Sequence, residues 1–176
     1  MSNQSYLNSS IHLFEYYRTL GETAIDQVKE NNLFREVTEE SNSIAIIVKH
    51  LSGNMLSRWT NFLTEDGEKE WRMRDDEFTD ADPNKEKLMQ RWNKGWDRLL
   101  NTLTQLTEED LTKHITIRGE QHTVIEAINR QLGHYAYHVG QIVFIARMLS
   151  ENWKSLSIPK NKSADFNKGI GSFLKK

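Results

Sequence analysis

Residues 123–150 read TVIEAINRQLGHYAYHVGQIVFIARMLS, and this segment decides the fold. It contains no proline, the strongest helix breaker, so it predicts one long helix. Thr123 stands where that helix would begin, and a threonine side chain there can accept a hydrogen bond from a free backbone N–H of the first turn.

Three further helices are predicted upstream, from apolar residues that recur every three to four positions. They cover about residues 6–31, 41–63 and 83–106. Pro83 would stand in the first turn of the third helix, where proline is tolerated. Four long amphipathic helices in a chain of 176 residues are typical of an all-α fold, a four-helix bundle.

The segments outside these helices complete a single domain, residues 1–176. Residues 114–122, HITIRGEQH, alternate and contain Gly119, so they predict a small hairpin or extended loop before the last helix. Residues 65–82 are strongly charged and form either a surface loop at one end of the bundle or a lid over a site. Residues 152–176 predict a C-terminal tail with one short helix.

The chain has no cysteine, and this single count excludes several classes of chemistry. Disulfides, cysteine-bound zinc, iron–sulfur clusters and a cysteine nucleophile all need a thiol. Any metal must therefore be held by nitrogen and oxygen donors. The six histidines are the first place to look for them.

Charge and hydropathy set further limits on the partners. A net charge of -2 argues against a broad nucleic-acid surface. No apolar run approaches the roughly 20 residues of a membrane-spanning helix, and the polar N-terminus lacks the apolar core of a signal peptide. We expect a cytoplasmic protein whose partner is a small-molecule substrate, with no nucleic acid and no membrane.

His134 and His138 lie four residues apart in the last predicted helix, so both imidazoles share one face and can bind one metal ion. Two hydrogen-bonded histidines without a metal are the plainer interpretation. Gly133 and Gly140 lie beside the pair, and glycine inside a helix costs about 0.5–1 kcal/mol relative to alanine. We therefore predict that a neighbouring helix approaches closely at these glycines.

A metal site needs a third donor, and His50 in the second predicted helix is the best candidate. It precedes Leu51 of the apolar stripe and so flanks the core. Gln131 and Gln141 stand three residues before and after the histidine pair, where they could hold a ring nitrogen or a bound water, or remain in solvent. Three protein ligands leave open positions on a metal, as in catalytic sites.

The remaining candidates are weaker. His12 lies near a helix start, and His114 and His122 flank the predicted hairpin. Arg118 at the turn could bind an anionic group, although a solvated turn residue is the plainer interpretation. The zinc-protease motif His-Glu-x-x-His is absent, because tyrosine and alanine fill the gap between the paired histidines. A zinc protease would therefore lack its general base.

The combination of Val48-Lys-His50-Leu on one helix with His134-x-x-x-His138-x-Gly-Gln-Ile142 far downstream resembles the DinB/YfiT-like metalloprotein superfamily, in its branch of uncharacterised bacterial proteins. The resemblance covers most of the chain. Further segments that share it are Gly53-Asn54-Met55, Gly67-Glu-Lys-Glu-Trp71, Arg118-Gly-Glu-x-His122 and Ile158-Pro-Lys.

This resemblance implies a four-helix bundle, commonly a homodimer, with a divalent metal between the helices. The ligands would be His50, His134 and His138, which are also the residues that the spacing selects. Members of the superfamily bind zinc, nickel or iron. Characterised relatives include S-transferases that use low-molecular-weight thiols, mycothiol-dependent isomerases and proteins assigned as hydrolases.

Two functions follow from these observations. The first is a metal-dependent enzyme, a thiol S-transferase or a hydrolase that acts on a small electrophile, in which the metal binds a thiol co-substrate as thiolate or activates a water. The alternative is a non-catalytic dimeric bundle whose metal stabilises the fold or serves in a stress response. The sequence predicts no general base and no other catalytic residue.

Overall fold

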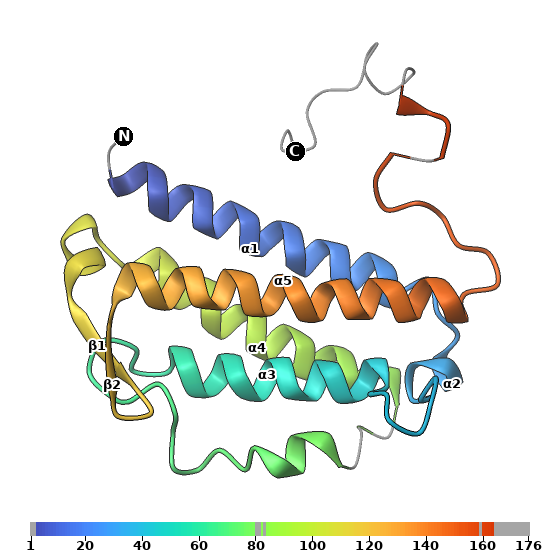
Figure 1. Ribbon diagram of the computed structural model, residues 1–176, viewed down its shortest axis with the longest axis horizontal. Helices are drawn as coiled ribbons and strands as arrows, with labels where there is room; N and C mark the ends of the chain where they lie inside the picture. The colour runs from blue at the N-terminus through green and yellow to red at the C-terminus, as the bar shows by residue number, and fades with distance from the viewer. Residues whose placement is uncertain (1–2, 80–81, 83, 159, 164–176) are drawn as a thin grey trace.

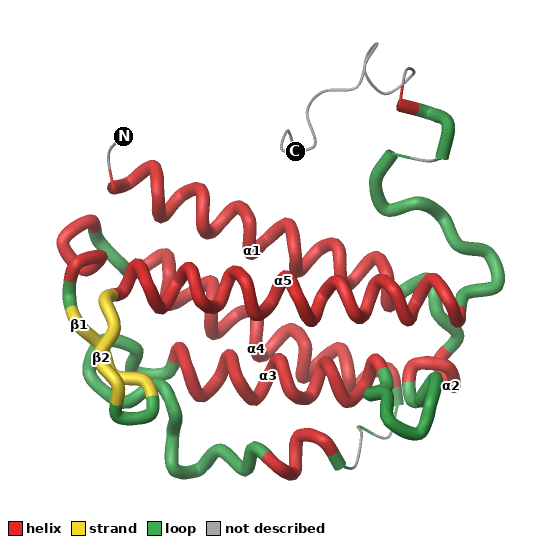
Figure 2. Tube along the Cα trace, viewed as in Figure 1, coloured by secondary structure: helices red, strands yellow, loops and turns green. Residues whose placement is uncertain are grey.

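The computed structural model describes residues 3–79, 82, 84–158 and 160–163 of the chain (Figure 1). The described residues are mostly helical, with a small two-stranded sheet at one end of the long helices (Figure 2). The long helices are α1 (Asn3–Ile25), α3 (Ile44–Trp59), α4 (Lys85–Gln105) and α5 (Val124–Leu149). The short elements are α2 (Glu30–Leu33), the 3-10 helices η1 (Asp75–Phe78) and η2 (Glu108–Thr112), and strands β1 (His114–Ile117) and β2 (Glu120–Thr123).

Large aromatic side chains hold the long helices together. Helix α1 packs along α5 and helix α3 packs along α4, and all four share one apolar core (Figure 1). The largest fully buried side chains there include Trp59, Trp92, Trp96 and Tyr135. The Trp59 Nε1–H donates a hydrogen bond to the Tyr135 hydroxyl at 3.0 Å, so these polar atoms are buried with a partner.

Helices α3 and α4 lie especially close together at Gly95. A Cβ atom at this position would stand 2.9 Å from the Cα of Ser52, which is closer than real Cβ contacts allow. Glycine therefore permits the backbones of the two helices to approach, and this fixes α3 in the position from which it presents His50.

Capping side chains determine where α3 and α5 begin. The Thr123 hydroxyl accepts the Glu126 N–H, while the Glu126 carboxylate accepts the N–H of Thr123, which completes a capping box. The predicted start of the last helix is thereby confirmed. Ser43 caps α3 in the same way by accepting the Ile46 N–H, so this helix begins at residue 44 rather than 41.

Two other predicted boundaries are wrong. The first helix ends at Ile25, because the chain turns and reaches an extended conformation at Lys29, and a separate short helix, α2, follows. The second ends at Trp59 rather than near residue 63, since Thr60 is extended. Pro83 and most of the predicted C-terminal helix lie outside the described residues.

The hairpin predicted at residues 114–122 is confirmed as an antiparallel pair in which His114 faces Thr123 and Ile117 faces Glu120. Arg118 and Gly119 form its turn with φ of 54° and 77°, both in the left-handed region that two-residue hairpin turns use. The Asp66 carboxylate accepts the backbone N–H groups of Arg118 and Gly119, each at 2.9 Å. The turn is therefore tied to the loop after α3.

No helix among the described residues is long and apolar enough to cross a membrane.

Candidate metal centre

The structure brings His50, His134 and His138 together, as the sequence predicts. His50 lies in the middle of α3, and the other two lie one turn apart on the facing side of α5. One nitrogen from each ring lies within 4.8 Å of the others, and the Nε2 atoms of His50 and His134 are 3.4 Å apart. Ligand atoms of a tetrahedral ion with bonds of about 2.0–2.1 Å are separated by about 3.3 Å, which matches the separation of the His50 and His134 nitrogens.

The opposite nitrogen of each ring makes a hydrogen bond to an oxygen. The three Nδ1 atoms face Glu77 Oε2 at 2.9 Å, Gln131 Oε1 at 3.3 Å and Gln141 Oε1 at 2.8 Å. Because a carboxylate or amide oxygen only accepts, the tautomer that satisfies all three contacts has its proton on each Nδ1 and a lone pair on each Nε2. Three lone pairs that converge without a proton between them are what a cation binds. The donor set therefore fits a divalent metal.

Burial also keeps two of the rings in the form that binds metal. Loss of solvent lowers the pKa of His134 to about 3; protonation of either neighbouring histidine would disfavour a second charge here, and the positive charges of Arg72 and Arg58 act in the same direction. Burial likewise lowers the pKa of His138, against a smaller opposing contribution from Gln141. Both imidazoles are therefore neutral near pH 7, as metal ligation requires.

Glu77 of η1 supports His50 from behind, and sequence reasoning did not identify it. Its carboxylate accepts the His50 Nδ1–H and two hydrogen bonds from Arg72, from Nε and Nη2 at 2.8 Å each. Burial alone raises the pKa of Glu77, but the hydrogen bonds from His50 and Arg72 outweigh it and lower the pKa. A carboxylate–histidine pair of this kind orients a metal ligand and raises its basicity.

A glycine on α3 makes room for this carboxylate. A Cβ atom at Gly53 would collide with the Glu77 side chain. The glycine three residues after His50 was therefore the one signal in the sequence that something packs beside the ligand. The sequence does not show that the side chain packed at Gly53 is Glu77, because residues 65–82 contain several carboxylates and no periodic pattern.

The described residues 65–79 of the charged connection, hereafter the cover segment, pack beside His50, although many of their side chains are exposed. Its helix η1 packs on α3, and the ring of Phe78 lies 4.9 Å from the ring of His50, centroid to centroid. At its other end, Ser57 Oγ donates to the Gly67 carbonyl and accepts the Lys69 N–H, which fixes the loop to α3. Of the two interpretations of this segment, the structure favours a cover over the histidines.

The predicted close helix contact at Gly133 and Gly140 is wrong. Both glycines are exposed, and a Cβ atom at either would meet nothing within 4 Å among the described residues. They lie on the face of α5 that points away from the other long helices. The prediction that Gln131 and Gln141 could hold a ring nitrogen is confirmed, since Gln131 contacts His134 Nδ1 and Gln141 contacts His138 Nδ1.

The weaker histidine candidates do not join the metal group. His114 is exposed on β1, and the His122 Nε2 lies 3.9 Å from the Glu120 carboxylate. His12 lies on α1, outside the cavity beside the metal group. Within the described part of the chain, no fourth histidine or carboxylate completes the cluster of three.

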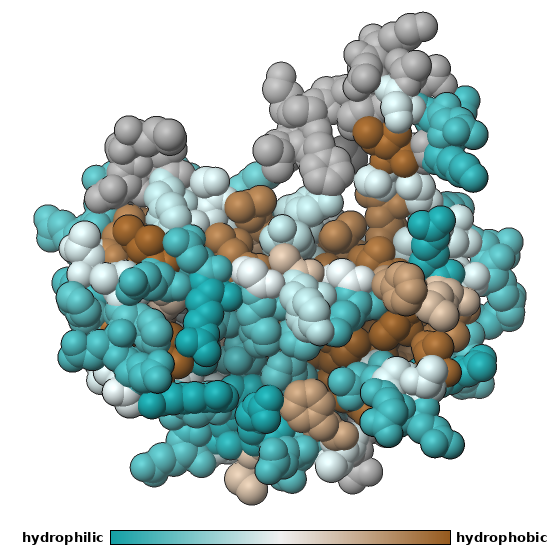
Figure 3. All heavy atoms as spheres, viewed as in Figure 1, coloured by the Kyte–Doolittle hydropathy of each residue, from teal (hydrophilic) through white to brown (hydrophobic). Residues whose placement is uncertain are grey.

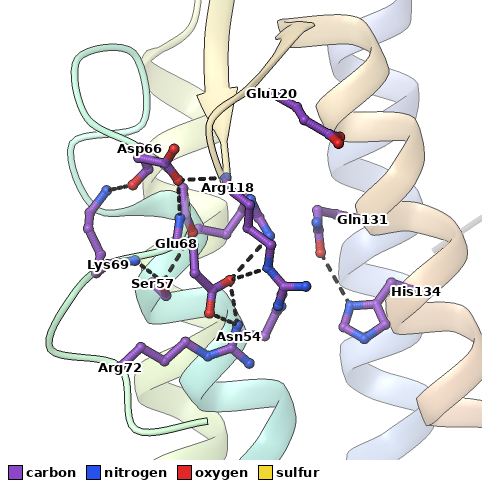
Figure 4. A network of polar contacts seen from close by, with 12 residues as sticks. Asn54, Ser57, Asp66, Glu68, Lys69, Arg72, Arg118, Glu120, Gln131 and His134 are labelled. Carbon is purple, nitrogen blue, oxygen red and sulfur yellow. Dashed lines mark hydrogen bonds and ion pairs between the residues drawn. The ribbon is translucent and has the colours of Figure 1, made fainter.

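A cavity of about 340 Å³ adjoins the three histidines. Residues from α3, α5, the hairpin turn and the cover segment line this cavity. Figure 4 shows part of the polar network at its wall, where Gln131 and His134 of α5 lie opposite Arg72, Glu68 and Arg118. The lining comprises the three histidines with Asn54, Phe78, Gln131, Arg58, Arg72, Arg74, Arg118 and Arg130. The open positions of a metal held by three imidazoles would therefore face a space that can hold a small molecule.

Comparison with known proteins gives a family but no activity. A family model described as a protein of unknown function, DUF1572, matches residues 1–162. No curated protein and no solved structure matches the chain. Because the matched segment covers most of its length, the chain belongs to the DUF1572 family.

Proposed function

We propose that this protein is a metal-dependent enzyme of the DinB/YfiT-like type, in which His50, His134 and His138 hold one divalent ion, zinc or nickel, or else iron. One observation carries the proposal. In the tautomer that these contacts favour, three Nε2 lone pairs converge while each Nδ1 is engaged by a hydrogen-bond acceptor, and such a convergence suits the binding of a cation. On this proposal the four long helices are the bundle that the resemblance implies.

The reaction that best suits this site is transfer of a thiol to a small electrophile, or hydrolysis of such a substrate. The bound ion would supply Lewis acidity, either toward a thiolate or toward a water whose pKa it lowers to about 7. The chain's own contribution is to orient the imidazoles through Glu77, Gln131 and Gln141. Since the chain has no cysteine, any sulfur in the reaction comes from the co-substrate.

The alternative is a non-catalytic bundle in which the metal only stabilises the fold or acts in a stress response. Such a site would be closed by a fourth protein ligand. The described residues supply three ligands beside a cavity of about 340 Å³, and this favours the enzyme. The proposal also includes a cytoplasmic homodimer with a small-molecule substrate; the composition and the resemblance support this part.

Elemental analysis of untagged protein tests the site. We expect one divalent ion per chain in the wild type and in a His12→Ala control, and loss of the ion in His50→Ala and His138→Ala. The metal-loaded wild type should also turn over a thiol with an electrophilic probe, or hydrolyse an activated ester, while the stripped protein should not. Less than half an equivalent of metal in the wild type would rule out the assignment. Metal binding without turnover, with a melting temperature that depends on His138, would favour the non-catalytic bundle.

A further inference from the structure

Among the described residues, five arginines and no carboxylate line the cavity beside the histidines. They converge from segments far apart in the sequence: Arg58 on α3, Arg72 and Arg74 on the cover segment, Arg118 at the hairpin turn and Arg130 on α5. Several guanidinium groups around one small space repel each other unless negative charge lies between or behind them. The carboxylates near these arginines determine how much of their positive charge the protein itself neutralises.

Three carboxylates lie near these arginines: Glu77 and Glu68 both bind Arg72, and Asp66 accepts backbone N–H groups at the hairpin turn and interacts electrostatically with Arg58. Glu77 binds Arg72 through two hydrogen bonds of 2.8 Å, and Glu68 binds its Nη1 at 3.2 Å through both oxygens. Glu68 also accepts the Arg118 Nε–H at 3.2 Å (Figure 4). Its carboxylate lies 4.0 Å from Arg58 Nη2. Glu68 thus contacts three of the five lining arginines, so a net positive charge remains at the cavity.

Arg58 is deeply buried, yet part of its guanidinium group lacks hydrogen-bond partners among the described residues. It is only 2% exposed, and its Nε and Nη1 have no hydrogen-bond partner among the described residues. A buried charged donor left unpaired is costly, because it has lost its water without a replacement. Burial, together with the charges of Arg130 and Arg72, lowers its pKa. Arg58 also lines the cavity, so an anion bound there would place negative charge beside this guanidinium group.

Two arginines at the rim are available to the same anion. The Arg118 side chain is 53% exposed and has a single long contact to Glu68. Arg130 is exposed on α5, and no ion pair or hydrogen bond joins its side chain to another described residue. Figure 3 shows a hydrophilic surface over the hairpin and the adjoining half of α5. Positive charge at the mouth of a cleft attracts an anionic ligand and raises its local concentration.

We propose that Arg58, Arg118 and Arg130 form an oxyanion subsite beside the metal centre, which binds a carboxylate or phosphate group of the substrate or of the thiol co-substrate. The subsite rests on the proposed function, and it narrows the substrate class to small anionic molecules. Guanidinium groups match both kinds of oxyanion through paired N–H donors. The charges surround a half-open cavity of about 340 Å³ rather than forming a broad surface, which fits a small molecule better than a nucleic acid.

Binding of two simple probes, inorganic phosphate and succinate, to metal-stripped protein tests this subsite. Calorimetry should detect saturable binding of at least one probe, and the tighter probe identifies the favoured oxyanion. Arg118→Gln and Arg130→Gln should each weaken binding about tenfold, since a hydrogen bond to a charged group is lost. Arg147→Gln, which removes an exposed arginine elsewhere on α5, should leave the affinity unchanged. Higher salt should weaken the binding.

Arg58→Gln should abolish binding if the fold survives, and circular dichroism checks whether it does. The rim variants keep the test decisive if this one does not fold. Absence of binding by both probes, or binding that is unchanged in both rim variants, overturns the subsite. Anions that bind only after metal loading, and equally in all variants, bind the ion itself and also overturn it. If anions bind but no metal does, the subsite stands while the proposed function fails.

Discussion

Among single residues, the most consequential one outside the histidines is Glu77. It joins His50, the candidate ligand on α3, to a buried arginine, so the position of His50 depends on a carboxylate that lies far from it in sequence. The glutamate is 6% exposed and its negative charge is held by Arg72. Removing the Glu77 charge therefore changes the orientation of His50. It also leaves the buried Arg72 guanidinium without this ion-pair partner.

We expect Glu77→Gln to weaken metal affinity about 10–100-fold, because the amide keeps the shape of the side chain but loses the negative charge that faces the His50 ring. Competition with a chromophoric chelator measures the affinity directly. Asp75→Asn, which removes an exposed carboxylate two residues earlier, is the matched control and should bind as the wild type does. Equal affinities for the two variants would show that Glu77 does not support the ligand.

On the scale of helices, α3 and α5 carry glycines with opposite roles. Gly53 on α3 faces the Glu77 side chain, whereas Gly133 and Gly140 on α5 face open space among the described residues. Alanine at Gly53 should displace Glu77 and reduce metal affinity. Alanine at Gly133 should leave the affinity unchanged and raise the free energy of unfolding by about 0.5–1 kcal/mol, the gain that alanine gives inside an exposed helix.

Chelator competition and thermal unfolding of Gly53→Ala and Gly133→Ala together check this contrast. A Gly53→Ala protein with full metal affinity would contradict the role assigned to the glycine. A Gly133→Ala protein that becomes less stable, and more so at higher protein concentration, would show that this face of α5 contacts a second copy of the chain.

Regular elements account for what the sequence could predict of the site. Helical periodicity placed His134 and His138 on one face, and the apolar stripe placed His50 near the core; the hairpin and the Thr123 cap followed from local signals. Glu77 lies in an irregular segment, where no periodicity says which carboxylate turns inward. Gly133 and Gly140 misled for a related reason, since spacing defines a face but not what lies opposite it.

For the whole molecule, a bound ion would link α3 to α5. The candidate ligands His50 and His134 on these helices lie 84 positions apart in the sequence. A ligand that binds only the folded state stabilises it, by about 4 kcal/mol at a thousandfold excess over its Kd. Stripping the metal should therefore lower the melting temperature, and adding zinc or nickel should restore it. Calorimetric unfolding of stripped and reloaded protein measures the shift, and His50→Ala should show none.

The ion pairs at the cavity wall also connect the two proposed binding events. A continuous series of contacts runs from Arg118 through Glu68, Arg72 and Glu77 to His50. An anion that draws Arg118 away from Glu68 would leave that carboxylate to Arg72, and so would act on the group that orients the metal ligand. The two sites would then be cooperative. By thermodynamic reciprocity, the factor by which anion changes metal affinity must equal the factor by which metal changes anion affinity.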